Sequence, residues 1–113
     1  MKQNEFVRNL GVGTFDLIVL DVLRDGPSYG YGIIKRILDQ SGRAIRWHEG
    51  TLYPVLHRLE QRGLLVGTWQ GPAGGRRRRY YRLTARGQHC WREQRDQWHT
   101  FSRGVNAPFS SPM

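Results

Sequence analysis

The sequence predicts a mainly α-helical fold of the α+β class, a winged helix-turn-helix with an N-terminal arm and a long C-terminal dimerisation helix. Three apolar patterns with helical spacing lie between residues 14 and 62. The third runs into a strand, a Gly/Pro loop and a return strand, the pattern of a β-hairpin. A longer amphipathic pattern follows. We expect an arm at 1–12, a winged domain at 13–84, a dimerisation helix at 85–106 and a flexible tail at 107–113.

The composition limits the class of protein. A chain of 113 residues, 38% of them hydrophobic, forms one domain or one domain with an appendage, and its small core favours self-association. The net charge of +9 attracts polyanions without specifying which one, so a weakly held membrane-surface protein stays open on charge alone. Cys90 is the only cysteine, which suits a reducing cytoplasm. The aliphatic run from Leu17 to Leu20 is far shorter than the roughly 20 residues that cross a bilayer, so we expect no membrane partner.

The first helix is expected after a polar arm whose apolar contacts are Phe6 and Leu10. Thr14 is a candidate N-cap for this helix. Gly26 and the proline after it then end the segment, because glycine suits a left-handed C-terminal position and proline cannot continue a helix. Ser28 is a candidate cap for the helix that follows.

The second helix is expected from Tyr29 to about Gln40. Its apolar residues fall at helical spacing, at Ile33, Ile34, Ile37 and Leu38. Gly30 and Gly32 fall in its first turn, where glycine costs helix propensity. We therefore expect close backbone packing at these two positions.

The third helix is expected to start near Thr51 and to end at Gly63. Its apolar face consists of Leu52, Val55, Leu56 and Leu59. The opposite face carries Thr51, Tyr53, Pro54, His57, Arg58 and Gln61. Pro54 is tolerated there if it falls in the first turn, and Glu60 is assigned to helix solubility. Two helices with a short connection, the second with a polar outer face, match a helix-turn-helix.

A hairpin is predicted next, with strands at 64–69 and 77–83 around a Gly/Pro loop. Alternation along the return strand places Arg79, Tyr81 and Leu83 on one face. Leu83 should point inward, so Tyr81 is expected inside as well. On the same face, Arg79 is expected to lead to an internal ion pair.

Thr84 is a candidate cap for a last helix from about Ala85 to Val105. Its apolar stripe consists of Cys90, Trp91, Trp98, Phe101 and Val105. Some 20 helical residues span about 30 Å, roughly the width of the whole domain, so this helix should project beyond it. Its tryptophans then need another surface. A second copy of the same helix is the simplest supplier, which predicts a two-fold dimer.

Four motifs follow one another along the chain: Tyr29-Gly30-Tyr31-Gly32 after Gly26-Pro27, the segment from Glu49 to Glu60, Gly63-Leu64-Leu65, and Arg78 to Thr84 with Gly87. In this order and spacing they resemble the PadR family of bacterial transcriptional regulators. The resemblance covers about residues 10 to 101. The Leu-Tyr-Pro segment at this distance from the Tyr-Tyr-Arg-Leu-Thr segment is a specific signal, whereas either motif alone would be moderate.

The resemblance implies a winged-helix homodimer that represses transcription by binding palindromic operators in double-stranded DNA. Within the family, the chain resembles the short subfamily, in which one C-terminal helix makes the dimer contact. Some short members bind flat aromatic or hydrophobic compounds between the subunits and release DNA. Carried over by position, Thr51, Tyr53 and His57 fall in the reading helix, Arg76 to Arg79 fall in the wing, and the dimer helix falls on Thr84 to Val105.

The expected DNA contacts are polar residues of the winged domain: Ser28, Tyr29, Thr51, Tyr53, His57, Arg58, Arg76, Arg77 and Arg78. Thr51 lies at a helix N-terminus, where backbone amides favour a phosphate oxygen. His57 and Arg58 are expected at base edges. The arginine run is expected to track phosphates or to enter a narrow minor groove. The alternatives are a solvated helix face and a solubilising loop.

The expected dimer or effector residues are Phe6, Leu10, Trp91, Trp98 and Phe101. For the tryptophans, core or dimer packing is the default, and a sandwich around a planar aromatic effector is the alternative. The sequence offers no metal-ligand spacing, carboxylate pair, nucleophile triad or phosphate-binding glycine loop, so we expect no metal, no cofactor and no enzymatic activity. Two further alternatives stay open, a nucleic-acid-binding protein without small-molecule input and a winged-helix protein-interaction module.

Overall fold

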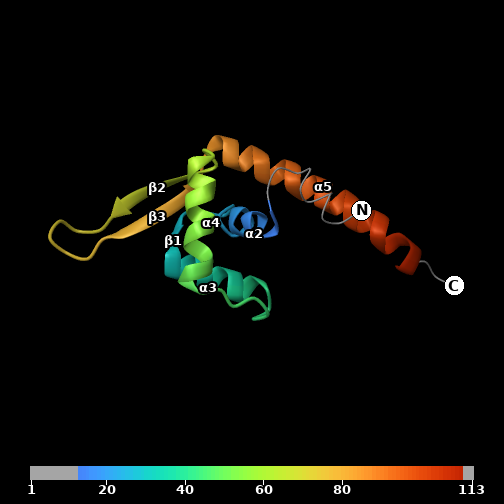
Figure 1. Ribbon diagram of the computed structural model, residues 1–113, viewed down its shortest axis with the longest axis horizontal. Coiled ribbons are helices and arrows are strands. Elements are labelled where there is room, and N and C mark those ends of the chain that lie inside the picture. Colours follow the sequence, from blue (N-terminus) through green and yellow to red (C-terminus); the bar gives the residue numbers. More distant parts are fainter. Residues whose placement is uncertain (1–12, 111–113) are drawn as a thin grey trace.

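The computed structural model describes residues 13–110, with the backbone alone for Trp98 and for residues 101–110. Its elements in chain order are α2 (Thr14–Val22), β1 (Ser28–Tyr29), α3 (Gly30–Gln40), α4 (Glu49–Gln61), β2 (Leu65–Gln70), β3 (Arg78–Leu83) and α5 (Ala85–Ser110). The three strands form one antiparallel sheet in the order β1-β3-β2. Figure 1 shows α2, α3 and α4 grouped together, with the β2–β3 hairpin projecting on one side and α5 extending on the other. The predicted winged-helix architecture is confirmed.

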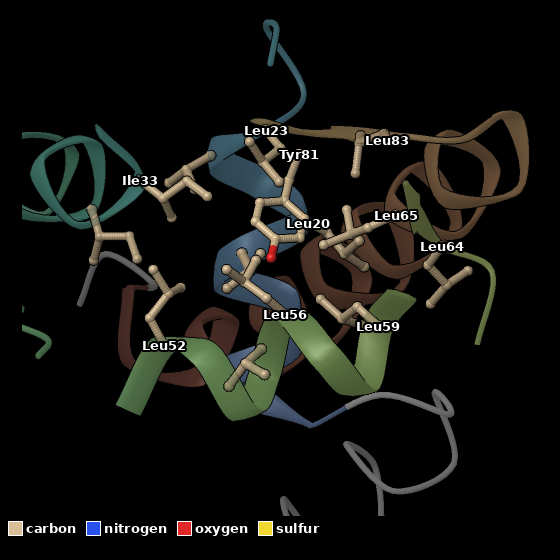
Figure 2. Close-up of a cluster of buried hydrophobic side chains, with 14 residues drawn as sticks. Leu20, Leu23, Ile33, Leu52, Leu56, Leu59, Leu64, Leu65, Tyr81 and Leu83 are labelled. Carbon is tan, nitrogen blue, oxygen red and sulfur yellow. The ribbon is translucent and has the colours of Figure 1, made fainter. Parts of the chain in front are cut away.

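The core lies between the three short helices and the inner face of the sheet. Figure 2 shows Leu20 of α2, Leu56 of α4 and Tyr81 of β3 converging at its centre. Each is at most 2% exposed, and full burial of a leucine contributes about 1.5–3 kcal/mol. Tyr81 and Leu83 both point inward, as the strand alternation predicts.

The start of α2 differs from the expectation. Its N-cap is Gly13, which makes no side-chain cap, so the prediction that Thr14 caps the helix is wrong. The carbonyl of Gly13 accepts a hydrogen bond from the amide of Leu17 at 3.0 Å. Gly26 follows the helix with a φ of 148°, a conformation that favours glycine, as predicted.

Arg36 of α3 closes the turn between α2 and β1. Its guanidinium donates hydrogen bonds to the carbonyls of Val22 at 3.0 Å, Gly26 at 2.9 Å and Pro27 at 2.9 Å. The carbonyl of Val22 is the last of α2 and the other two follow the helix, so none of them has a helical partner. The side chain therefore ties α3 to the end of α2.

The strand β1 was not expected from the sequence. Ser28 pairs with Tyr81 and Tyr29 pairs with Tyr80, which adds a third strand to the predicted hairpin. The N-cap of α3 is Tyr29 without a side-chain cap, and Ser28 is only 5% exposed. The prediction that Ser28 caps the second helix is therefore wrong, and its buried side chain has little surface for a DNA contact.

Gly30 and Gly32 allow close packing at the start of α3, as predicted, although the neighbours are side chains. A Cβ at Gly30 would overlap the hydroxyl of Tyr53, and a Cβ at Gly32 would overlap the hydroxyl oxygen of Ser28. The Tyr-Gly-Tyr-Gly motif thus lets α4 and β1 approach the first turn of α3.

α4 starts at Glu49, two residues before the expected position. Pro54 is consequently the sixth helical residue and not a first-turn residue, so the predicted reason for its tolerance is wrong. Lacking an amide hydrogen, Pro54 cannot donate to the carbonyl of Gly50. The C-terminal end is as expected, because Gly63 has a φ of 77° and its amide donates to the carbonyl of Glu60 at 3.0 Å.

α5 begins as predicted and ends later. The Thr84 hydroxyl oxygen accepts a hydrogen bond from the Gly87 amide at 2.9 Å, which confirms the predicted cap. The helix continues to Ser110, so the expected tail at 107–113 is wrong as far as residue 110. Its 26 residues correspond to about 39 Å at 1.5 Å per residue. No helix among residues 13–110 is long and apolar enough to cross a membrane.

Gly87→Ala is expected to destabilise the protein by about 1–3 kcal/mol, because its Cβ would overlap the backbone carbonyl oxygen of Leu64, the residue before β2. Gly50→Ala is the matched control, since a Cβ there meets nothing within 4 Å and alanine favours the helix by up to about 1 kcal/mol. Urea denaturation of both variants measures the difference. Equal stability of the two variants would contradict the close approach of α5 to Leu64.

Candidate nucleic-acid interface

α4 divides into a buried and an exposed face. Leu52, Leu56 and Leu59 are fully buried against the core. Tyr53 is 38% exposed and His57 is exposed, one helical turn further along. The two predicted contact residues Tyr53 and His57 thus share a surface that the core does not use.

The start of α4 differs from the expected phosphate site. Thr51 is half-buried, and its amide donates to the carbonyl of His48 at 3.0 Å. His48, not Thr51, is the N-cap residue. The amide of Thr51 therefore has a partner within the helix. Thr51 still lies in the first turn of α4, and its contact with phosphate stays a prediction.

Arg58 is also bound within the molecule. Its Nη2 and Nε donate to the carboxylate of Asp16 in α2, at 2.5 Å and 3.4 Å. The Asp16 side chain is 3% exposed, whereas that of Arg58 is 50% exposed. The hydrogen bond with Asp16 raises the pKa of Arg58 above its usual value. Arg58, expected at a base edge, is instead the principal partner of a buried carboxylate, with Arg62 at 4.0 Å as a second cation.

The wing contains two kinds of arginine. Arg76, Arg77 and Arg78 are exposed, and within residues 13–110 no carboxylate lies at ion-pair distance from them. Arg79 instead donates to Glu60 of α4 at 2.7 Å, which confirms the predicted internal ion pair and raises the pKa of Arg79.

Glu60 fixes the hairpin against α4 and does not merely serve solubility, so that assignment is wrong. Besides Arg79, its carboxylate accepts a hydrogen bond from the amide of Gly67 in β2 at 3.3 Å. A Cβ at Gly67 would lie 2.6 Å from Nε of Arg79, so glycine leaves room for the guanidinium. The angle between the reading helix and the wing depends on this contact.

Trp69 is a surface residue that the sequence patterns do not single out. It lies on β2 opposite Arg79, with the guanidinium 5.7 Å from the ring, and it is 58% exposed. Strand alternation places it on the same face as Gly67 and Leu65. An exposed tryptophan on the wing adds an apolar surface next to the arginines.

The outer face of the sheet holds an aromatic pair with an arginine. Tyr29 and Tyr80 lie opposite each other with ring centroids 5.3 Å apart. The guanidinium of Arg78 lies over the Tyr29 ring at 4.8 Å. Two predicted contact residues, Tyr29 and Arg78, are therefore in direct contact with each other.

Trp91 packs within its own chain. Its indole N–H donates to Asp21 of α2 at 2.9 Å, and the guanidinium of Arg95 lies 4.7 Å from its ring. Trp91 thus packs against the core of its own chain, which is one of the two forms of packing expected as the default, and it does not need a second copy for this contact. Cys90 also packs on the core, and burial raises the pKa of its thiol. Phe6 and Leu10 lie outside the described residues, as do the side chains of Trp98 and Phe101.

Within the part of the chain that the structure describes, histidine, cysteine, aspartate and glutamate side chains nowhere form a group of three or more that could hold a metal ion. The interface is built from hydroxyl, imidazole, guanidinium and aromatic groups, which bind phosphates, sugars and base edges.

Comparisons with known proteins agree on one family. The model of the transcriptional regulator PadR-like family matches residues 19–93. The transcriptional regulator Rv3488 of Mycobacterium tuberculosis is 45% identical over 65 residues, which are 58% of this chain and 60% of that protein. A PadR family transcriptional regulator from Eggerthella lenta has a TM-score of 0.72 at 36% identity, covering 96% of this chain and 93% of its own.

A further solved structure is that of Bacillus subtilis PadR in complex with operator DNA. Its TM-score is 0.64 at 21% identity, over 72% of this chain and 46% of that chain, which is a likeness of fold. The family model spans more than half of the present sequence. The chain belongs to the PadR-like family of transcriptional regulators, whose members are regulators and not enzymes.

Arg58→Met is expected to lower the free energy of unfolding by about 1–3 kcal/mol, because it leaves the buried Asp16 carboxylate without its principal partner. His57→Ala, on the exposed side of the same turn, should change it by less than about 0.5 kcal/mol. Adding Asp16→Asn to Arg58→Met should recover part of the loss. Urea denaturation measures all three variants, and a neutral Arg58→Met would show that the ion pair does not hold α2 to α4.

Proposed function

We propose that this PadR-like regulator is a homodimeric repressor that binds a palindromic operator in double-stranded DNA. The observation that carries the proposal is the distribution of groups on the winged domain. α4 has exposed Tyr53 and His57 on the face turned from the core. The adjoining wing has exposed arginines at 76, 77, 78 and 82 for which no carboxylate lies at ion-pair distance among residues 13–110. This combination fits a groove bordered by phosphates.

In the proposed complex, the two copies of α4 enter successive major grooves about 34 Å apart on one face of the DNA. The arginines at 76–78 contact the phosphates beside each groove, which supplies affinity without choosing sequence. Tyr53 and His57 are then the side chains closest to base edges. Bacillus subtilis PadR, which shares the fold, has been solved in complex with operator DNA, and this supports operator DNA as the partner of the present chain.

The proposed dimer contact is α5. Only its first turns are needed for the contacts at Gly87, Cys90 and Trp91, whereas the helix continues to Ser110. Figure 1 shows this remainder extending away from the winged domain. A second copy of α5 would cover it, and the dimer would set the distance between the two reading helices. Such a repressor acts where the bacterial chromosome lies, so we propose a cytoplasmic location.

We further propose that a small hydrophobic or aromatic effector binds between the α5 helices and weakens operator binding. An effector can act only if it binds the two spacings of the reading helices with unequal affinity. Trp91 is already held by Asp21, so the effector contacts are assigned to Trp98 and Phe101.

Fluorescence anisotropy should show tight, strongly salt-dependent binding to DNA upstream of the protein's own gene, with weaker binding to random duplexes. Arg76→Ala with Arg77→Ala should weaken binding to both duplexes alike. The plot of log K against log salt should become shallower, its negative slope shrinking in magnitude by about 0.9 for each phosphate that the variant no longer neutralises. Arg86→Ala, which removes an exposed arginine in the first turn of α5 and outside the proposed dimer contact, is the control and should leave the slope nearly unchanged.

An unchanged slope in the wing variant would remove the wing from the contact surface. Equal binding to both duplexes would place the operator elsewhere. Absence of binding to either duplex at low salt would contradict the DNA-binding function and favour a protein partner for the basic face.

Planar cationic dyes are expected to quench tryptophan fluorescence and to compete with operator DNA if the effector site exists. Trp98→Phe should abolish most of the quenching, whereas Trp91→Phe should retain it, because Trp91 is held within the chain. Light scattering should give the mass of a dimer for both variants. Quenching that survives Trp98→Phe, or that has no effect on DNA binding, would contradict the proposed effector site.

A further inference from the structure

The arginines of the wing differ in how firmly their side chains are held. Arg79 is neutralised by Glu60, whereas Arg76 and Arg77 lie in the loop before β3. Arg78 is the first residue of β3, and its guanidinium lies over the ring of Tyr29 at 4.8 Å. Among the exposed arginines of the wing, Arg78 thus has a fixed platform and an uncompensated charge.

Tyr29 is itself held in place. Its backbone pairs with Tyr80 in the sheet, and the two rings meet at 5.3 Å with a tilt of 56°. On its other side, the ring lies close to Gly32, where a Cβ would be 3.3 Å from Cε1 of Tyr29. The strand pairing, the ring of Tyr80 and the glycine together leave the ring of Tyr29 little freedom.

This stack adjoins the reading helix. Tyr29 directly precedes Gly30, and the hydroxyl of Tyr53 in α4 occupies the space that a Cβ of Gly30 would need. A guanidinium stacked on a ring keeps its N–H groups in its own plane, free for two parallel hydrogen bonds to a phosphate. A duplex whose major groove receives α4 would bring a backbone phosphate next to the same surface.

We infer that Tyr29 is a positioning residue that orients the guanidinium of Arg78, and that the pair binds one DNA backbone phosphate beside the reading helix. The inference rests on the proposed function and deepens it. Tyr29 acts through its ring and not through a direct hydrogen bond from its hydroxyl to DNA. Arg78 therefore fixes the register of the protein on the duplex, whereas Arg76 and Arg77 supply general attraction.

Operator affinity of four variants tests the assignment. Tyr29→Phe keeps the ring and should bind within about twofold of the wild type. Tyr29→Leu should weaken binding about twofold to fivefold for each protomer, hence about fourfold to twenty-five-fold for the dimer. Arg78→Ala should weaken binding at least as much. Because Tyr29 acts through Arg78, the double variant Tyr29→Leu with Arg78→Ala should bind no more weakly than Arg78→Ala alone.

Arg77→Ala provides the matched control, since Arg77 is an exposed arginine of the loop next to Arg78. Its effect should add to that of Tyr29→Leu, giving the product of the two fold-changes. Urea midpoints check that each variant is folded at the assay temperature. In the free wild-type protein, the Arg78 side-chain protons should show an upfield NMR shift from the Tyr29 ring, and Tyr29→Leu should remove it.

Distinct results overturn the inference and the proposed function. If Tyr29→Leu weakens binding by the same factor with and without Arg78, Tyr29 does not act through Arg78 and the inference fails while DNA binding stands. A large loss in Tyr29→Phe would likewise assign the role to the hydroxyl. No operator binding by the wild type would overturn the proposed function together with the phosphate assignment.

Discussion

The carboxylate of Asp16 is the constraint on which the arrangement of the helices depends. The Asp16 side chain is only 3% exposed, and a carboxylate buried to this extent must have an ion-pair partner and hydrogen bonds. Arg58 of α4 provides the positive charge and the hydrogen bonds. Drawing Arg58 toward α2 fixes the rotation of α4 about its axis. With that rotation fixed, the apolar residues of α4 face the core, and Tyr53 and His57 face outward. The interaction thus ties the guanidinium of Arg58 to Asp16 and orients Tyr53 and His57 on the surface proposed for DNA binding.

The same helix α2 links the reading helix to α5. Asp16 faces Arg58, and five residues later Asp21 accepts the indole N–H of Trp91. α2 is therefore held at one end to α4 and at the other to α5 by polar contacts, in addition to its apolar packing. In the proposed dimer, the distance between the two reading helices depends on how rigidly α5 is joined to each winged domain. The two aspartates supply that rigidity from a single helix of nine residues.

The parts of the fold that the sequence predicts are those coded by local patterns. Apolar periodicity locates the helices, alternation turns Tyr81 and Arg79 inward, and Thr84 marks the start of α5. What escapes prediction is non-local. Two residues, Ser28 and Tyr29, form a strand only because Tyr80 and Tyr81 lie beside them, and no periodicity exists in so short a segment. The partners of Arg58 and Glu60 could not be predicted for the same reason, because each depends on how another element packs against α4.

The formal charge of +9 is distributed unequally, and this distribution decides what the basic residues can do. Several arginines have carboxylate partners and serve the structure, among them Arg24, Arg58, Arg62, Arg79 and Arg95. Part of the excess lies on the wing, where Arg76, Arg77 and Arg78 stand next to one another, and the rest is spread over other exposed residues such as Lys35, Arg43 and Arg86. Phosphate contacts from such a cluster carry little sequence information. In the proposed complex, choice of operator therefore rests on the uncharged groups and the imidazole of α4, and the wing arginines determine how α4 is placed in the groove.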